Sequence, residues 1–460
     1  MSIFIFRRDL RLTDNNGFFE LQKHTSDIIP VFIFTPEQVT DKNKFKSNNA
    51  IQFMIESLLD LQKEFKKRKS DMLFYQGDNL TILKKMHKAV GLQHIGFNRD
   101  YTPYARKRDD QIEKWAKSEG IECHITEDYL LSSEIGVLNK SNGDPYTVFT
   151  PFKNNGLSLN VPRPRGNPIR SIADKSIVTS FSNMTKPQGI LEHELNENIL
   201  VRGGRTNALV KLQAVKKQSK YDQTRNTPSI QTTELSAYIK FGNVSIREVF
   251  HKFKTLHGLQ SGLISQLFWR EFYFYIAYYF PKVLQGKALV DKYDKVKWRK
   301  NAKELEMWKN GMTGYPIVDA GMRQLNTTGY MHNRLRLITS NFLNRMLGMD
   351  WREGELYYAQ QLTDYDPSVN NGNWQWTASV GVDTKPYFQR LFNPWLQSEK
   401  FDKNAEYIKK WIPELKNVPA DHIHHWDEHY TKYSKIDYPK PIVDYKKARE
   451  RSVQMYRAAM

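Results

Sequence analysis

Five short apolar runs in the first 127 residues alternate with segments of helical pattern, and this alternation limits the fold more than any other feature. The runs are rich in β-branched and aromatic residues, which is typical of buried strands. Strands separated by helices need crossover connections, so we expect a parallel sheet covered by helices. The expected strands are 3–6, 28–34, 72–75, 94–97 and 122–125, and the expected helices are 50–66, 80–90 and 104–118.

The pattern changes twice beyond residue 127. Residues 128–195 are rich in Ser, Asn, Gly and Pro, as in SNGDPY and VPRPRGNP, which predicts a long linker. Helical patterns then dominate, and eight of the ten tryptophans lie between Trp269 and Trp411. The run FWREFYFYIAYYF at 268–280 is too apolar for an exposed helix. We therefore expect an α/β domain at 1–127, a linker at 128–195 and an all-helical domain at 196–460.

The charge balance favours a polyanionic partner. The chain has 69 Lys and Arg against 50 Asp and Glu, a formal net charge of +19. Such an excess favours nucleic acid as the partner, with a solvated basic surface as the alternative. The single cysteine, Cys123, excludes an intramolecular disulfide framework and a cysteine-rich zinc site. The first residues lack the order of a secretory signal, and no apolar run is long enough to span a bilayer. These features predict a soluble, intracellular protein.

Common catalytic motifs are absent. The sequence has no GxSxG, HExxH or P-loop, and no GxGxxG follows the first expected strand. The segment 421–429, DHIHHWDEH, gathers four of the twelve histidines. Its spacing matches no zinc motif, so surface histidines are favoured over a metal site. We predict no metal.

The segment 328–381 concentrates polar residues within the aromatic helical region. Asn333 and Arg336 are three apart and would share a helix face, and Asp364 and Asp366 fall in a polar turn. Buried carboxylates, amides and arginines need hydrogen-bond partners. Either a satisfied polar network or a large heteroaromatic cofactor would supply them. The turn is followed by Asn370, Asn371, a helix break expected at Gly372, Trp374 and Trp376.

Motifs along nearly the whole chain resemble the photolyase/cryptochrome family, and in particular its class I DNA photolyases. They are FRRDLRLTDN (6–15), VFTPFKN (148–154), WREFY (269–273), TGYPIVDAGMRQLNTTGYMHNRLR (313–336), DWREGE (350–355), NNGNWQW (370–376) and FNPWLQSEKFD (392–402). The resemblance implies a Rossmann-like antenna-type α/β domain joined by a long linker to a helical FAD-binding domain. This expectation agrees with the fold inferred from the residue patterns.

The resemblance implies which residues hold FAD. Arg336 would pair with Asp364, which would keep a buried carboxylate ionised. Asp364 and Asp366 fall on the carboxylates for flavin and ribose, and Asn370 on the position that faces flavin N5. A neutral amide there supports an anionic reduced flavin, which favours a photolyase over a cryptochrome. The implied cofactor-binding residues are Tyr221, Thr232, Thr233, Glu234, Leu235, Ser236, Gln266, Arg270, Asn333, Arg336, Asp364, Asp366 and Asn370.

The implied reaction is light-driven DNA repair by a deoxyribodipyrimidine photo-lyase, a carbon–carbon lyase. Excited reduced FAD donates an electron to a cyclobutane pyrimidine dimer, the ring splits, and the electron returns. The protein positions and tunes the cofactor. Asn370 and Gln266 would act at the reacting groups. The tryptophans through which the family photoreduces oxidised flavin match Trp374, Trp351 and Trp298.

UV-damaged DNA is the implied partner, bound by a monomer. The lesion must be flipped out of the duplex to reach a buried flavin. Trp269 and Trp376 match the aromatic walls of the lesion pocket. Arg225, Arg334 and Arg390 would contact phosphates, although FQRLFNP at 388–394 carries one residue more than the usual spacing before Arg390.

Two positions bear on the lesion type, and they disagree. Gln266 stands where cyclobutane photolyases usually have glutamate, and glutamine is more usual in (6-4) photolyases and animal cryptochromes. Against a (6-4) activity, Leu337 takes the place of the second histidine that this chemistry needs. We expect a cyclobutane dimer photolyase, with a (6-4) photolyase or a cryptochrome-type blue-light photoreceptor as the alternative. A flavin-free basic DNA-binding protein is a third hypothesis.

The second chromophore of the family is not identified by the sequence. Tyr104 and Ala105 stand where folate-binding members carry asparagine and glutamate. The folate pattern is therefore broken. The segment 97–110 is more similar to that of deazaflavin-type or antenna-free members, and both alternatives stay open.

Overall fold

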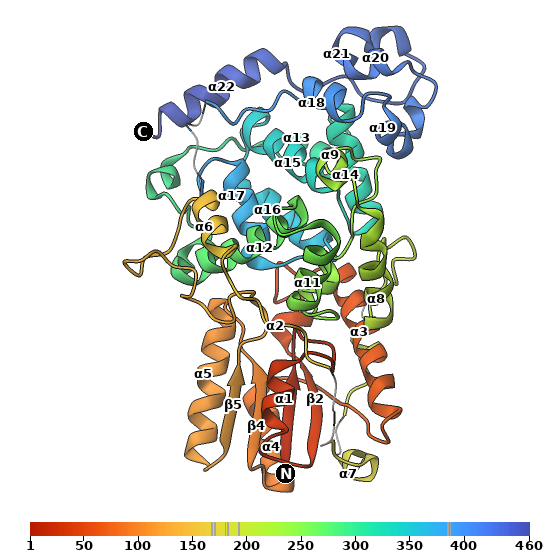
Figure 1. Ribbon diagram of the computed structural model, residues 1–460. Coiled ribbons are helices and arrows are strands. Elements are labelled where there is room, and N and C mark those ends of the chain that lie inside the picture. The colour runs from red at the N-terminus through yellow and green to blue at the C-terminus, as the bar shows by residue number, and fades with distance from the viewer. Residues whose placement is uncertain are drawn as a thin grey trace.

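The computed structural model describes all residues except 167–168, 170–171, 180, 182–183, 192–193, 384–385 and 387. A sheet with helices on its faces forms the N-terminal half, and helices form the C-terminal half, which lies beyond one end of the sheet (Figure 1). This arrangement confirms the expected fold class.

The sheet is parallel throughout, with strand order β3-β2-β1-β4-β5. Four strands are aligned at their first residues, because Ser2 pairs with Ile28 and with His94, and His94 pairs with Glu122. Every expected strand is confirmed to within one residue at each end. The strands are β1 (Ser2–Phe6), β2 (Ile28–Phe34), β3 (Leu73–Gln76), β4 (His94–Asn98) and β5 (Glu122–Thr126).

Alternate side chains of each strand serve two separate cores, because successive residues point to opposite faces of the sheet. Phe4 and Phe6 pack in the core that includes α1 (Asn16–Leu21) and α3 (Asn48–Lys66). Ile3 and Ile5 pack with residues of the helices on the other face. Those helices are α4 (Asn79–Val90) and α5 (Pro103–Ser118), while α2 (Pro36–Val39) is a single turn after β2.

The core under α3 continues into the helical half. The Phe53 ring lies 5.1 Å, between ring centroids, from both Tyr238 and Phe241. Near the first turn of α3, the Asn49 side chain donates a hydrogen bond of 2.7 Å to the carbonyl of Gln361. The apolar core is therefore continuous between the two halves of the molecule.

The segment expected to be a linker, 128–195, makes specific contacts with both halves. The backbone N–H groups of Leu131 and Ser132 donate to the buried carboxylate of Glu271 at 2.7 and 2.8 Å. Ala173 donates its backbone N–H to Ile28 of the sheet at 2.9 Å. Its described helices are α6 (Phe149–Gly156), α7 (Lys175–Thr179) and the 3-10 turn η1 (Pro187–Ile190). The domain limits at 127 and 195 stay a prediction.

Helices from residue 205 onward form the second half. No helix in the described part of the chain is long and apolar enough to cross a membrane. The α-helices are α8 (Arg205–Ala214), α9 (Tyr221–Thr224), α10 (Ser236–Lys240), α11 (Ile246–His257), α12 (Gly262–Tyr279), α13 (Ala302–Lys309), α14 (Pro316–Thr328), α15 (Asn333–Asn341), α16 (Trp351–Gln361), α17 (Pro367–Thr377), α18 (Pro394–Phe401), α19 (Glu406–Trp411), α20 (Ala420–His424), α21 (Trp426–His429) and α22 (Tyr445–Arg457). Shorter turns are η2 (Val215–Lys217), η3 (Pro281–Gln285), η4 (Asp291–Lys295), the π-helical η5 (Phe342–Met346), η6 (Pro413–Leu415) and η7 (Tyr430–Tyr433). Buried residues of α8, α10, α11 and α12 belong to the core that continues from α3, and a second large apolar core is formed by residues from Ala288 onward.

The helix break expected at Gly372 is wrong, because α17 runs through it without interruption. A Cβ atom at Gly372 would lie 2.1 Å from the ring of Tyr273 on α12. The glycine therefore serves close packing of α17 on α12.

A buried network of charges joins the N-terminal loop to α11. Arg247 bridges two carboxylates, with its guanidinium 2.9 Å from Asp14 and 2.7 Å from Asp128. Arg11 lies 2.5 Å from Asp128. All four side chains are at most 5% exposed. Burial favours the neutral form of Asp128, but the two guanidinium charges outweigh it and lower the pKa of this carboxyl.

Candidate functional site

An ion pair between α15 and the turn before α17 forms the centre of the polar region. Arg336 donates to Asp364 at 2.9 Å and to the carbonyl of Met331 at 2.9 Å. Desolvation opposes the charge of Arg336, but Asp364 outweighs it and raises the pKa of the guanidinium. The pairing expected from the sequence is therefore present. Within the described part of the chain, the second carboxylate oxygen of Asp364 is buried without a hydrogen-bond partner.

Asp366 holds the start of α17 and contacts the α/β half. Its side chain accepts hydrogen bonds from the backbone N–H groups of Ser368 and Val369 at 3.0 and 3.2 Å. It also pairs with Arg8, which follows β1 and lies 3.3 Å from Asp100. The ion pair with Arg8 occupies one oxygen of the carboxylate that the sequence assigned to ribose. Among the described residues, the buried hydroxyl of Ser368 has no partner.

Asn370 and Asn371 on α17 both bind Glu355 of α16. The Asn370 side chain donates to the carbonyl of Glu355 at 3.0 Å, and that of Asn371 to its carboxylate at 2.9 Å. Burial raises the pKa of Glu355 to about 7, although the bond from Asn371 works in the opposite direction. Because the amide nitrogen of Asn370 is engaged, its carbonyl oxygen is left as the atom available to a ligand.

The TTELS segment leads into α10, which has five residues. The hydroxyl of Thr232 lies 3.4 Å from that of Tyr330. Glu234 has a left-handed backbone with φ of 52°, and its carboxylate pairs with Lys211. One oxygen of the Glu234 carboxylate is thus engaged within the protein. Of the other expected residues, Leu235 is buried, Thr233 is half-buried, and Ser236 and Asn333 are exposed.

Three expected residues share one face of α12, because Gln266, Trp269 and Arg270 are spaced three and four apart. All three are half-buried. Arg270 donates to the carbonyl of Tyr129 at 2.8 Å. Trp269 stacks on Phe149 of α6, with 3.6 Å between ring centroids and 8° between planes. The stack fixes the plane of Trp269.

Arg390, for which the resemblance implies a phosphate contact, is directed into the protein in this structure, and the contact stays a prediction. Arg390 is 6% exposed, and its guanidinium lies 3.7 Å from the ring centroid of Trp376. It donates to the carbonyls of Trp376 and Asp383, both at 2.9 Å. Its donors are thus used inside the protein, and the residue positions Trp376.

Arg334 and Arg225 lie close together at the surface of the helical half. Arg334 donates to the side chain of Asn226 at 2.7 Å and lies 4.3 Å over the Phe401 ring. Burial lowers the pKa of Arg334, and the charge of Arg225 lowers it further. Two neighbouring cations of this kind favour an anion between them.

The tryptophans expected to carry electrons lie in the second core. Trp351 and Trp374 are 1% exposed, whereas Trp298 is half-buried and contacts Tyr456 at 5.8 Å. Trp374 contacts two aromatic residues that the sequence interpretation missed. They are Tyr358, at 4.8 Å between centroids, and Trp308, at 6.2 Å.

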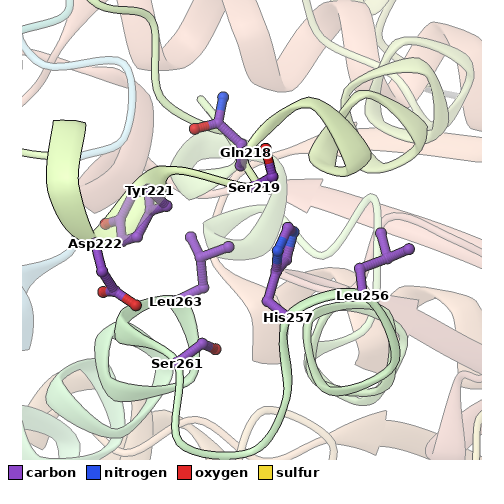
Figure 2. Close-up of a pocket in the computed structure, with 8 residues that line it drawn as sticks. All are labelled: Gln218, Ser219, Tyr221, Asp222, Leu256, His257, Ser261 and Leu263. Atoms are coloured by element: carbon purple, nitrogen blue, oxygen red, sulfur yellow. The ribbon is translucent and has the colours of Figure 1, made fainter.

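Tyr221 lines a cavity of about 300 Å³ between α9, the end of α11 and the start of α12 (Figure 2). Asp222 accepts a hydrogen bond of 3.1 Å from the backbone of Gly262 at its edge. Burial raises the pKa of Tyr221 to about 12. This volume is at the lower end of the range for small-molecule sites. The residues that line the cavity are Gln218, Ser219, Tyr221, Asp222, Leu256, His257, Ser261 and Leu263.

Comparisons with known proteins agree along the chain. A family model described as DNA photolyase matches residues 2–167, and one described as the FAD binding domain of DNA photolyase matches residues 263–458. The deoxyribodipyrimidine photo-lyase of Buchnera aphidicola subsp. Acyrthosiphon pisum is 37% identical over 478 residues, which cover 99% of this chain and 96% of the relative. The chain belongs to the DNA photolyase family.

Solved photolyases share the fold over their full length. The archaeal photolyase of Sulfolobus tokodaii, described with two FAD molecules, has a TM-score of 0.88 and 37% identity, with 99% of both chains covered. The class III photolyase of Agrobacterium tumefaciens has a TM-score of 0.91 and 31% identity. The superposition covers 100% of this chain and 97% of the Agrobacterium chain. The photolyase fold therefore extends over both halves.

The polar region fits the FAD of a photolyase. The orphaned oxygen of Asp364 can accept from an N–H group, and the hydroxyl of Ser368 can bind a further polar atom. Buried polar atoms without partners are rare in native proteins, so a polar ligand is the expected partner.

Sequence reasoning missed several residues around this site. Arg8 was overlooked because nothing near it in the sequence indicates that it reaches Asp366. Lys240 was overlooked for the same reason, because it lies far in the sequence from Arg8 and Asp366, with which it interacts electrostatically in the structure. Desolvation, assisted by the charge of Arg8, lowers the pKa of Lys240 to about 7. Glu355 lies within the quoted DWREGE motif, where the second glutamate could have been singled out.

Glu355 makes the stability of this photolyase depend on pH. With a pKa of about 7 in the folded protein against 4.5 ordinarily, the folded state keeps a proton that the unfolded chain has lost. Stability should therefore fall as pH rises from about 4.5 to about 7 and then level off. Glu355→Gln should remove this slope from the thermal midpoint measured across the range. The exposed Glu353→Gln on the same helix is the control, and a variant slope equal to that of the parent would contradict the assignment.

Proposed function

We propose that this chain is a light-driven DNA repair lyase that splits cyclobutane pyrimidine dimers. The main support is the Arg336–Asp364 ion pair, which lies inside the region matched by the FAD-binding family model. One oxygen of Asp364 in this pair is buried without a hydrogen-bond partner among the described residues. When bound, reduced FAD supplies the photoexcited electron. In this proposal the protein acts inside the cell as a monomer. A second chromophore, unidentified, would serve as antenna.

Specific residues hold and orient the cofactor in this proposal. Asp364 would accept from a flavin N–H while it pairs with Arg336. Asn370, whose amide nitrogen donates to the carbonyl of Glu355, would face flavin N5. Backbone groups of Thr232–Ser236 bind the phosphates with Tyr221, and Arg270, Gln266, Asn333 and Asp366 complete the site. Trp374, Trp351 and Trp298 would serve as the electron carriers toward this cofactor.

The lesion would enter a pocket walled by Trp269 and Trp376. Flipping it out of the duplex costs about a few kcal/mol of stacking and pairing. Phe149 and Arg390 hold these indoles in place before DNA binds, which reduces the ordering that binding requires. Arg225 and Arg334 then bind phosphate.

Repair of a dimer-containing oligonucleotide under blue light, compared with darkness, tests the function. We expect splitting of the cyclobutane dimer, with recovery of the two pyrimidines, only in the light and by a protein with flavin absorption bands. Light-dependent repair of the (6-4) product alone would favour the (6-4) alternative. Absence of any repair by flavin-containing protein would favour a photoreceptor, and a colourless protein would favour a flavin-free DNA-binding protein.

Arg334→Ala should weaken binding to damaged and undamaged DNA alike. Loss of one phosphate contact should reduce the slope of log K against log salt by about 1. Binding isotherms at several salt concentrations measure it. Arg68→Ala, which removes an exposed arginine just beyond the C-terminal end of α3, is the control. An unchanged slope in Arg334→Ala would contradict the phosphate contact.

Gln266→Glu should raise the repair yield per photon on cyclobutane dimers without changing flavin content. The two side chains have nearly the same volume, so the substitution tests electrostatics. A half-buried carboxyl has a raised pKa and, when protonated, can donate to the lesion. Repair yield under calibrated blue light measures it, with the exposed Gln260→Glu as control. Loss of a (6-4) activity in Gln266→Glu would reverse the lesion assignment.

A further inference from the structure

Three histidines and a glutamate converge at the amino ends of β4 and β5, at the end of the sheet away from the helical half (Figure 1). His94 and Glu122 are cross-strand partners, and His124 lies two residues further along β5. All three side chains therefore project from the same face of the sheet. His24 follows α1, which packs on this face.

The donor atoms have the spacing of a metal site. His94 Nδ1 lies 3.1 Å from His124 Nε2 and 3.4 Å from a carboxylate oxygen of Glu122. His124 Nε2 lies 3.7 Å from the same oxygen. Ligands at about 2.0–2.1 Å from a tetrahedral Zn²⁺ are about 3.3 Å apart. The three observed distances bracket this value.

His24 is the candidate for the fourth position. A ring nitrogen of His24, one of His124 and an oxygen of Glu122 all lie within 4.8 Å of one another. The His24 ring is 6.3 Å from that of His94 between centroids, and its Nε2 lies 3.5 Å from Glu20, so His24 must turn toward His94 to complete the shell. The His24 ring stacks on His124 at 4.2 Å between centroids. The loop that carries His24 is held on the sheet by a hydrogen bond of 2.9 Å from Ser2 to Thr25. With a side chain 39% exposed, His24 has room to close onto a metal.

We propose that His24, His94, Glu122 and His124 bind a zinc ion that clips the loop after α1 to β4 and to the edge strand β5. Three imidazole nitrogens and one carboxylate oxygen suit Zn²⁺, whereas Mg²⁺ and Ca²⁺ prefer all-oxygen sites. The four donors fill a tetrahedral shell, so the site is structural. It lies outside the FAD region and does not depend on the proposed repair function.

A second cluster serves as the internal control. Asp421, His422 and His429 also lie together in the C-terminal half. There, however, only two imidazoles are present. We therefore expect zinc at the sheet.

Calorimetric titration of Zn²⁺ into the chelator-treated, flavin-containing protein without an affinity tag tests the proposal. We expect one tight site in the parent and an increase of its thermal midpoint with zinc. His24→Ala and Glu122→Gln, both at exposed side chains, should each weaken binding by at least about 10-fold, and the double variant should abolish it. Flavin content should stay at the parent level in each variant.

X-ray absorption of the zinc-loaded parent should show a four-coordinate shell of nitrogen and oxygen at about 2.0–2.1 Å, without sulfur. His422→Ala should leave the tight site unchanged. The proposal is overturned if the parent binds no zinc, if the double variant binds like the parent, or if His422→Ala removes the site.

Discussion

Arg247→Met is expected to lower the free energy of unfolding by about 3–5 kcal/mol, the cost of breaking a buried ion pair by removing one partner. The substitution leaves Asp14 and Asp128 buried, with Arg11 as the remaining cation beside Asp128. Methionine replaces the volume of the arginine stem, so the loss reports charge and not a cavity. Urea denaturation of parent and variant, followed by circular dichroism, measures it.

A matched surface arginine gives the control. Arg202 also bridges two carboxylates, those of Glu56 and Glu197 at 3.0 and 3.1 Å, but its side chain is 40% exposed. Arg202→Met should cost at most about 1 kcal/mol. The parent should also lose stability as pH falls through the lowered pKa of Asp128, and the variant should lose less. Equal losses from the two arginine substitutions would contradict a structural role of the buried network.

Asp364→Asn is expected to deplete the protein of flavin. The substitution removes the anion that pairs with Arg336 and the acceptor that we assign to the flavin. Hydrogen bonds to charged groups contribute about 1.5–3 kcal/mol, so the affinity should fall by roughly 10- to 150-fold. The ratio of flavin to protein absorbance after purification, and titration of the apoprotein with FAD, measure the change.

Glu353→Gln provides the comparison for Asp364→Asn, because it removes a carboxylate at an exposed position of α16. It should retain the flavin content of the parent. If Asp364→Asn retained the flavin as well, Asp364 would be a structural partner of Arg336 and not a cofactor ligand.

The sheet was predictable from the sequence because its signals are local. Each strand is a short apolar run, and the helix at 48–66 begins at a serine whose side chain caps it, 3.1 Å from the N–H of Ala50. Capping and periodicity act over a few residues, so a linear scan detects them. The pair Arg336–Asp364 followed from the motif resemblance, since physical reasoning alone left a structural network and a cofactor site as alternatives.

The remaining features depend on residues far apart in the chain. Arg8 and Asp366 are 358 positions apart, and no local pattern connects them. Gly372 was expected to break a helix because glycine has low helix propensity. It lies instead within a helix, at a position where the ring of Tyr273 leaves no room for a Cβ atom. Arg390 was assigned to DNA from its motif, and only the fold shows its donors turned inward. The histidines at 24, 94 and 124 were missed because three separate elements bring them together.

The core that continues from α3 into the helical half limits how photolyase sequences can be recombined. A chimera that exchanged residues 1–127 as a module would replace Phe53 and Asn49 while keeping Tyr238, Phe241 and Gln361 from the other parent. The two parts of such a chimera would meet in a buried core whose side chains do not fit one another, and not at a flexible hinge. Exchange should succeed only when α3 and the helices that it packs against come from the same parent. The segment that must be exchanged as a whole therefore extends across the apparent domain boundary.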